Sequence, residues 1–246
     1  MTPQPAKRRY RNALEQIEEG LHACWQNAQD LVKASDQLLA AELHAPALSL
    51  AVLALEELAK LVAIDGLLFA RPDDWKADDF KKATKSHAVK LSILEVLPLL
   101  LRHLAMFDPR WTEPTFKLVL TAGITQLVED GDAVMAEMPD GSFQMLDDWK
   151  QRGFYAACTD SGFVASSSAV PPTLAQKVRQ LAWRATTTLD FLLKGGNLER
   201  YIQEARSIRG ELSEQQLQAL EALGAQMATE RFAASETKDN KDGEED

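Results

Sequence analysis

The sequence predicts an all-α fold, and three observations support this prediction. Good helix formers (Ala, Leu, Glu, Gln and Lys) are abundant. Apolar residues recur at three-to-four spacing, whereas Val, Ile and Thr runs with period-two alternation are scarce. At 246 residues and 46% apolar content, the chain is long enough for one sizeable core, or for a core plus an appendage.

The first two helices are predicted over about residues 7–39 and 46–69. An apolar stripe marks the first: Leu14, Ile17, Leu21, Cys24, Ala28, Leu31 and Leu38. Pro46 suits the first turn of the second helix, which we expect to end before Arg71-Pro72. Its segment ALSLAVLALEELAKLVAI (47–64) is apolar except for Ser49 and three central charges. Each charge would cost about 2.5–3.5 kcal/mol in a bilayer, so we interpret the segment as a buried helix and not a membrane span.

The same spacing predicts further helices at about residues 79–106, 113–136, 173–193, 198–209 and 214–232. Pro98 is expected to bend the third helix, and MPDGS (138–142) to form a turn. Residues 143–172 contain Phe, Tyr, Gly and Ser and end in Pro-Pro, so they are interpreted as a short helix followed by an irregular or hairpin-like loop.

Charge and cysteine content limit the functional classes. The net charge of −10 argues against a broad nucleic-acid-binding surface, but it leaves room for a local basic site. Two cysteines do not form a disulfide framework and fit a reducing cytosol, so a cytoplasmic location is expected. The N-terminus lacks the apolar region of a secretory signal.

Three charged clusters are candidates for a site. In the first, Glu57 and Glu56 precede Lys60 by three and four residues, so both can reach it on a helix. Buried charges need partners. The cluster is therefore either an ion pair that fixes helix register or part of a polar site.

The second cluster is DDFKKATKSHAVKL (78–91), in which four lysines flank His87: Lys81, Lys82, Lys85 and Lys90. Histidine exchanges protons near neutral pH, and nearby lysines favour its neutral, basic form. They would also attract phosphate. The alternative is a solvated, lysine-rich first turn with an incidental histidine.

The third cluster is DWKQRGFYAACTD (148–160), which places Lys150, Arg152 and Tyr155 on the short segment before the loop. These side chains could bind an anion, with the tyrosine hydroxyl as a hydrogen-bond donor. The alternative is a surface helix end with Tyr155 packed into the core.

In order and spacing, EELAK (56–60), HAVK (87–90) and KQRGFY (150–155) resemble the AbiV-type abortive-infection family of the HEPN superfamily. The resemblance covers roughly residues 8–195. It implies a small HEPN-like helical bundle, with 143–172 as a loop insertion. The predicted helical extension over 196–233 and the acidic tail 234–246 lie outside the resemblance, and the tail is expected to be disordered.

The resemblance implies a bacterial protein that defends against phage. HEPN domains are commonly dimeric, and many are metal-independent ribonucleases. In that case RNA is the substrate, and no cofactor or metal is needed. The usual superfamily motif, Arg followed four to six residues later by His, is absent, and Lys82 stands at the arginine position before His87. Lysine is a point charge without the guanidinium fork.

The mechanism that this implies uses His87 as the general base, with Lys90 and either Lys60 or Arg152 stabilising the phosphate. Glu56 or Glu57 would orient His87 or Lys60. Lys82, Lys85, Lys150, Arg152 and Tyr155 are the expected phosphate-binding residues. Two protomers would face a shared groove, and a neighbouring protein partner or inhibitor is a further expectation.

The main alternative is a non-catalytic, dimeric HEPN-like module that binds RNA, a nucleotide or a protein. A di-iron bundle needs two Glu-x-x-His motifs, and only Glu19 to His22 fits. The four histidines and two cysteines show no close zinc-ligand pairing.

Overall fold

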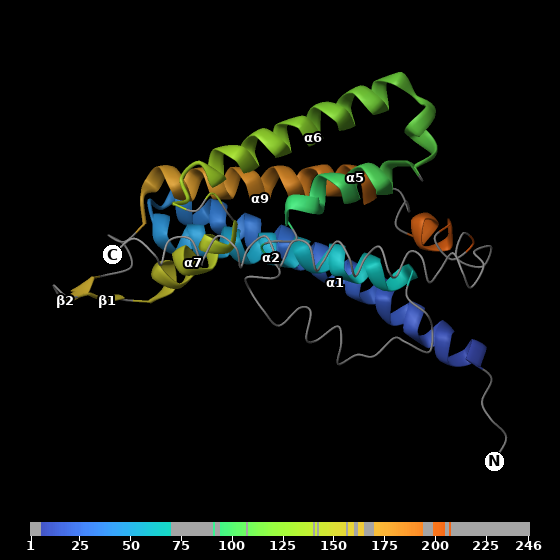
Figure 1. Cartoon of the computed structure of the whole chain (residues 1–246), viewed down its shortest axis with the longest axis horizontal. Helices are drawn as coiled ribbons and strands as arrows, with labels where there is room; N and C mark the ends of the chain where they lie inside the picture. Colours follow the sequence, from blue (N-terminus) through green and yellow to red (C-terminus); the bar gives the residue numbers. More distant parts are fainter. Residues whose placement is uncertain are drawn as a thin grey trace, which may run out of the picture. The chain divides into compact units, whose positions relative to one another are not determined.

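The structure, a computed structural model, describes residues 6–69, 91, 94–106, 108–139, 141, 143–155, 157–159, 162–164, 170–193, 199–204 and 207. Within these ranges, the side chains of residues 6–16, 65–69, 144 and both strands are not described. Residues 1–203 form one compact unit, and residues 204–246 are grouped separately. The predicted all-α class is confirmed (Figure 1). The predicted domain boundaries stay a prediction.

The two longest helices, α1 (Ala6–Ala40) and α2 (His44–Phe69), form the centre of the first unit. A tight turn joins them, with Glu42 in the left-handed region at φ 60°. The Ser35 hydroxyl donates a hydrogen bond of 2.8 Å to the carbonyl of Ala47 across the pair. Both predicted helices are confirmed, although α2 begins two residues before Pro46.

Helix α2 is surrounded by other helices, since α1, α9 (Pro172–Leu193) and α7 (Leu146–Phe154) all pack against it. Most of its residues from Ala45 to Leu61 are therefore buried. This explains its nearly uniform apolar sequence, because a helix covered on all sides needs no polar face. Among the described helices, none is long and apolar enough to cross a membrane.

The predicted helix 79–106 is described only in its last part. A 3₁₀ turn (Leu94–Val96) leads into α5 (Leu97–Met106), so the chain changes helix type just before Pro98. A proline ring clashes with the carbonyl four residues earlier and lacks the N–H donor, which accounts for the change at the expected bend. Residues 79–90 lie outside the described part of the chain.

Helix α6 (Pro114–Met135) follows a 3₁₀ turn (Pro109–Thr112) and lies alongside α9, as Figure 1 shows. Arg110 stabilises the turn before α6, because its guanidinium is hydrogen-bonded to Asp108. The same guanidinium lies 4.6 Å and 5.0 Å from the ring centroids of Phe116 on α6 and Phe191 on α9. Ion pairs from α9 to its neighbours, Arg179 to Asp36 and Arg184 to Asp130, complete the packing.

The segment 143–172 contains the predicted short helix and hairpin. A 3₁₀ turn (Phe143–Met145) leads into α7, which precedes strands β1 (Ala157–Thr159) and β2 (Gly162–Val164). The strands are antiparallel, with Cys158 opposite Phe163. Residues 199–204 are helical, within the predicted helix 198–209, whereas 214–232 and the tail lie outside the described residues.

Candidate functional site

The two adjacent glutamates of α2 contact different parts of the protein. Successive residues on an α-helix point about 100° apart, because a turn contains 3.6 residues. Glu56 therefore meets α7, whereas Glu57 faces α1. The polar residues of the EELAK motif thus belong to two separate clusters.

The first cluster is a buried ion network between α2 and α7. The Lys150 ammonium donates to a Glu56 carboxylate oxygen at 2.6 Å, and it lies 2.5 Å from a carboxylate oxygen of Asp147. The Lys150 and Glu56 side chains are only 3% and 2% exposed, whereas that of Asp147 is 30% exposed. One ammonium is thus held between two carboxylates. Such a geometry offsets much of the desolvation penalty of burying these charges.

A close backbone approach brings α7 to this position. The Ser49 hydroxyl, buried on α2, is 2.8 Å from the carbonyl oxygen of Lys150 and 3.2 Å from that of Ala45, and it can donate to either. A Cβ at Gly153 would lie 2.1 Å from the Ser49 oxygen and 2.5 Å from the Ala45 oxygen. Only glycine fits there. Ser49 therefore lies on the same side of α2 as Glu56.

The second cluster joins α2 to α1. The Lys60 ammonium is 2.5 Å from a Glu57 carboxylate oxygen, in a pair that is 25% and 15% exposed. Burial raises the pKa of the Cys24 thiol on α1 to about 11, and the negative charge of Glu57 and a hydrogen bond to its carboxylate add to the shift. The thiol is therefore protonated near neutral pH.

Arg152 and Tyr155 lie apart from the buried network. Both are exposed, and Tyr155 is 65% exposed. The Arg152 guanidinium lies 5.0 Å from the ring centroid of Trp149 on the same helix. The alternative in which Tyr155 packs into the core is therefore wrong. Because Lys150 points inward, the structure does not bring the three predicted anion-binding side chains together.

Four of the predicted site residues, Lys82, Lys85, His87 and Lys90, lie outside the described residues. Their proposed roles as base and phosphate ligands stay predictions. Sequence reasoning missed three contributors to the described site: Asp147, Gly153 and the hydroxyl of Ser49 as an interhelix donor. The signal for the first two was their spacing, since each lies three residues from Lys150 and so shares its face of α7.

One group of described side chains comes close enough to hold a cation. Ligand atoms of Glu18, His22 and Glu199 all lie within 4.8 Å of one another. The imidazole of His22 is 3.6 Å from the Glu199 carboxylate, and both side chains are nearly half exposed. We interpret this group as a surface contact between α1 and the helical residue Glu199.

Comparison with known proteins identifies the family. The AbiV model of the HEPN domain families matches residues 16–186, which include α2, α5, α6 and α7 and most of α1 and α9. No curated protein and no solved structure matches the chain. The matched range contains all three motifs and both partners of the buried Glu56–Lys150 pair. The chain therefore belongs to the AbiV family of HEPN domains.

Proposed function

We propose that this protein is an abortive-infection effector that acts on RNA as a metal-independent, HEPN-type ribonuclease. Family membership supports the defence role. The observation that carries most weight is the Glu56–Lys150 pair, because it joins two family motifs that are 94 residues apart in the sequence. A buried, paired contact between motif residues indicates a built polar centre and not an incidental charged surface.

In the proposed reaction, His87 accepts the proton of a ribose 2′-hydroxyl. The 2′-oxygen attacks the adjacent phosphorus, and the bond from phosphorus to the 5′-oxygen breaks. The products are a 2′,3′-cyclic phosphate and a 5′-hydroxyl, whose oxygen takes a proton from the protonated base or from water. Lys90, with Lys60 or Arg152, stabilises the charge that develops on the phosphate.

In this scheme, the described residues mainly hold the helices in position around the reacting groups. The Lys150 ammonium already contacts two carboxylates, so we assign it to positioning α7 on α2 and not to binding phosphate directly. Arg152 and Tyr155, exposed at the end of α7, are then the groups of this helix that can meet RNA. Glu57 orients Lys60 at 2.5 Å.

A second candidate function is a non-catalytic module that binds RNA, a nucleotide or a protein. Two observations favour it: lysine replaces the superfamily arginine before His87, and the charge of Lys150 is neutralised by two carboxylates. A binding module needs the fold and the exposed cations but not a general base. Replacing His87 distinguishes the two functions.

The test is induced expression of wild type and His87→Ala in a bacterial host, with growth followed and total RNA run on a gel. Growth arrest with RNA fragmentation in wild type, absent from the mutant, is expected. His22→Ala is the matched control, because this half-exposed imidazole lies outside the three motifs. Cleavage that persists in His87→Ala would exclude the scheme. Intact RNA in wild type, with and without phage infection, would favour the binding module.

The proposal includes a homodimer in the cytoplasm whose two sites face one groove, with a neighbouring protein that restrains the activity. Sedimentation equilibrium of the full chain measures whether the protein is a dimer. A strictly monomeric protein that still cleaves RNA would remove the shared groove from the scheme while leaving the chemistry in place.

A further inference from the structure

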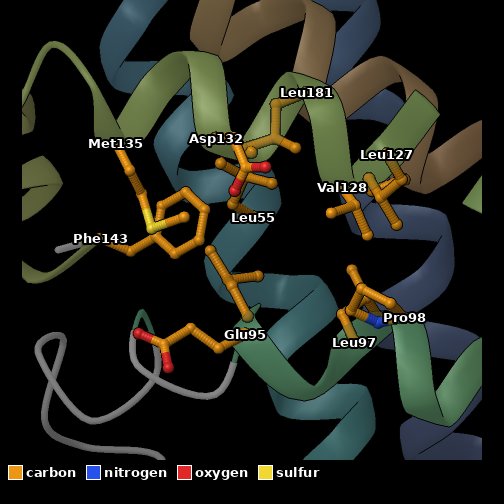
Figure 2. Close-up of a pocket in the computed structure, with 13 residues that line it drawn as sticks. Leu55, Glu95, Leu97, Pro98, Leu127, Val128, Asp132, Met135, Phe143 and Leu181 are labelled. Atoms are coloured by element: carbon orange, nitrogen blue, oxygen red, sulfur yellow. The ribbon is translucent and has the colours of Figure 1, made fainter. Parts of the chain in front are cut away.

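An apolar pocket lies against α2, where Leu55 forms part of its wall (Figure 2). Its volume is about 160 Å³. The lining side chains come from α2, the 3₁₀ turn Leu94–Val96, the start of α5, α6, the turn before α7, and α9. They include Leu55, Glu95, Val128, Gly131, Asp132 and Phe143.

The size and lining of the pocket suit a single aromatic ring. Apolar cavities of about 150 Å³ stay dry and bind benzene, because water finds no hydrogen-bond partners there. Leu55 is buried and Phe143 is 5% exposed, whereas Val128 is 44% exposed and lies where the pocket meets solvent. A ring can therefore enter between Val128 and its neighbours without opening the core.

The charged side chains among the pocket's described lining residues are of one sign. Its two charged lining residues, Glu95 and Asp132, are both acidic and both exposed. Figure 2 shows the Glu95 carboxylate extending outward from the apolar side chains. Two carboxylates beside an apolar cavity complement a cation attached to an apolar body and repel an anion. The pocket therefore does not suit the phosphate groups of RNA.

The position of the pocket connects it to the α2–α7 contact. Leu55, in its wall, directly precedes Glu56, and Phe143 begins the turn that leads into α7. Phe143 is closely packed, since a Cβ at Gly131 would lie 3.4 Å from its ring. A molecule in the pocket would contact α2 and the turn that precedes α7.

We propose that this pocket is a binding site for a small aromatic cation, with the ring among the apolar side chains and an ammonium group facing Asp132. Occupancy stabilises α7 against α2. The proposal does not depend on ribonuclease activity, because it rests on the pocket and its charges alone.

The test uses benzylammonium as the probe and the full chain labelled with ¹³C at the Leu and Val methyl groups. Benzylammonium at millimolar concentration is expected to shift the methyl signals of Leu55 and Val128 but not that of Val119, which lies outside the pocket on α6. Neutral benzyl alcohol should bind more weakly, and phenylacetate weakest. Equal binding of the alcohol and the ammonium would overturn the charge assignment, and unshifted pocket methyls would overturn the site.

Two matched pairs of variants sharpen the test. Val128→Trp places an indole over the pocket and should abolish binding, whereas Val119→Trp, on the exposed part of the same helix, should not. Asp132→Asn should weaken binding by about twofold to fivefold, the range for an exposed ion pair, and Glu129→Gln should leave it unchanged. Equal effects within either pair would contradict the proposal.

The stabilising effect has its own measurement. Amide hydrogen exchange in residues 146–154 should slow when benzylammonium binds the wild type, and not in Val128→Trp. Binding without slower exchange would show that the pocket holds the ligand but does not act on α7, which would overturn that half of the proposal.

Discussion

Two ion pairs one residue apart on α2 differ in almost every physical respect. Glu56 pairs with Lys150 across 94 residues of sequence, and both side chains are at most 3% exposed. Glu57 pairs with Lys60 three residues away, and these side chains are 15% and 25% exposed. The first pair fixes how two helices dock, whereas the second mainly supports one helix. Neighbours in sequence can thus have unrelated roles, because a helix directs them to different surroundings.

The largest expected effect is that of removing one partner of the buried pair. Lys150→Met leaves the Glu56 carboxylate buried opposite an apolar side chain, so the free energy of unfolding should fall by about 3–5 kcal/mol. Urea unfolding followed by circular dichroism measures this. The double variant Glu56→Leu/Lys150→Met should recover a large part of the loss, because it removes the buried carboxylate together with the ammonium. A double variant less stable than Lys150→Met would show that the charges themselves stabilise the contact.

The next prediction concerns the close approach beside the buried pair. In Gly153→Ala, the new Cβ would lie 2.1 Å from the Ser49 oxygen, so α7 must move away from α2. Overpacking of this kind costs about 1–3 kcal/mol. Gly20→Ala is the control, since its Cβ would meet only the end of the Ile64 side chain at 3.4 Å and alanine favours helix. Thermal unfolding of both variants checks this, and equal melting temperatures would contradict the close approach.

The half-exposed pair should matter less. Lys60→Met removes a partner that water can partly replace, so we expect a loss of about 0.2–1 kcal/mol. If this loss equalled that of Lys150→Met under the same urea titration, the distinction between the two pairs would be wrong. Added salt should reduce the effect of Lys60→Met more than that of Lys150→Met, because exposed charges are screened more strongly.

The smallest expected effect is on the reactivity of Cys24 next to Glu57. Its pKa is raised from 9.0 to about 11 by burial and then by the Glu57 charge, and the thiolate is the reactive form. Alkylation by iodoacetamide should be slow at neutral pH and speed up as the pH rises toward 11. Glu57→Gln should lower the pKa and speed alkylation at a given pH. Both proteins, with and without Glu57→Gln, carry Cys158→Ser so that only Cys24 can react. Equal alkylation rates in the two would show that Glu57 does not affect the Cys24 thiol.

The pH dependence of stability follows from the same shift. The folded pKa of Cys24 lies above the unfolded value, so above pH 9.0 the unfolded chain ionises first. The contribution of this thiol to stability is therefore complete below pH 9.0 and is lost as the pH rises toward about 11.

The sequence alone determined the all-α class and the extents of α1, α2, α6 and α9, because apolar spacing and proline positions are local signals. It also determined the Glu57–Lys60 pair, since residues three apart on a helix meet whatever the fold. The short helix and hairpin after Phe143 were likewise predictable from turn residues and a final Pro-Pro.

Only the tertiary structure decided which partner Glu56 takes. The spacing along α2 allowed either glutamate to pair with Lys60. The direction of Glu56 around the helix instead points it toward α7, where it pairs with Lys150. The role of Gly153 and the apolar pocket beside Leu55 also depend on docking between segments distant in sequence. Such contacts follow from how side chains of several helices fill space together, which local pattern does not specify.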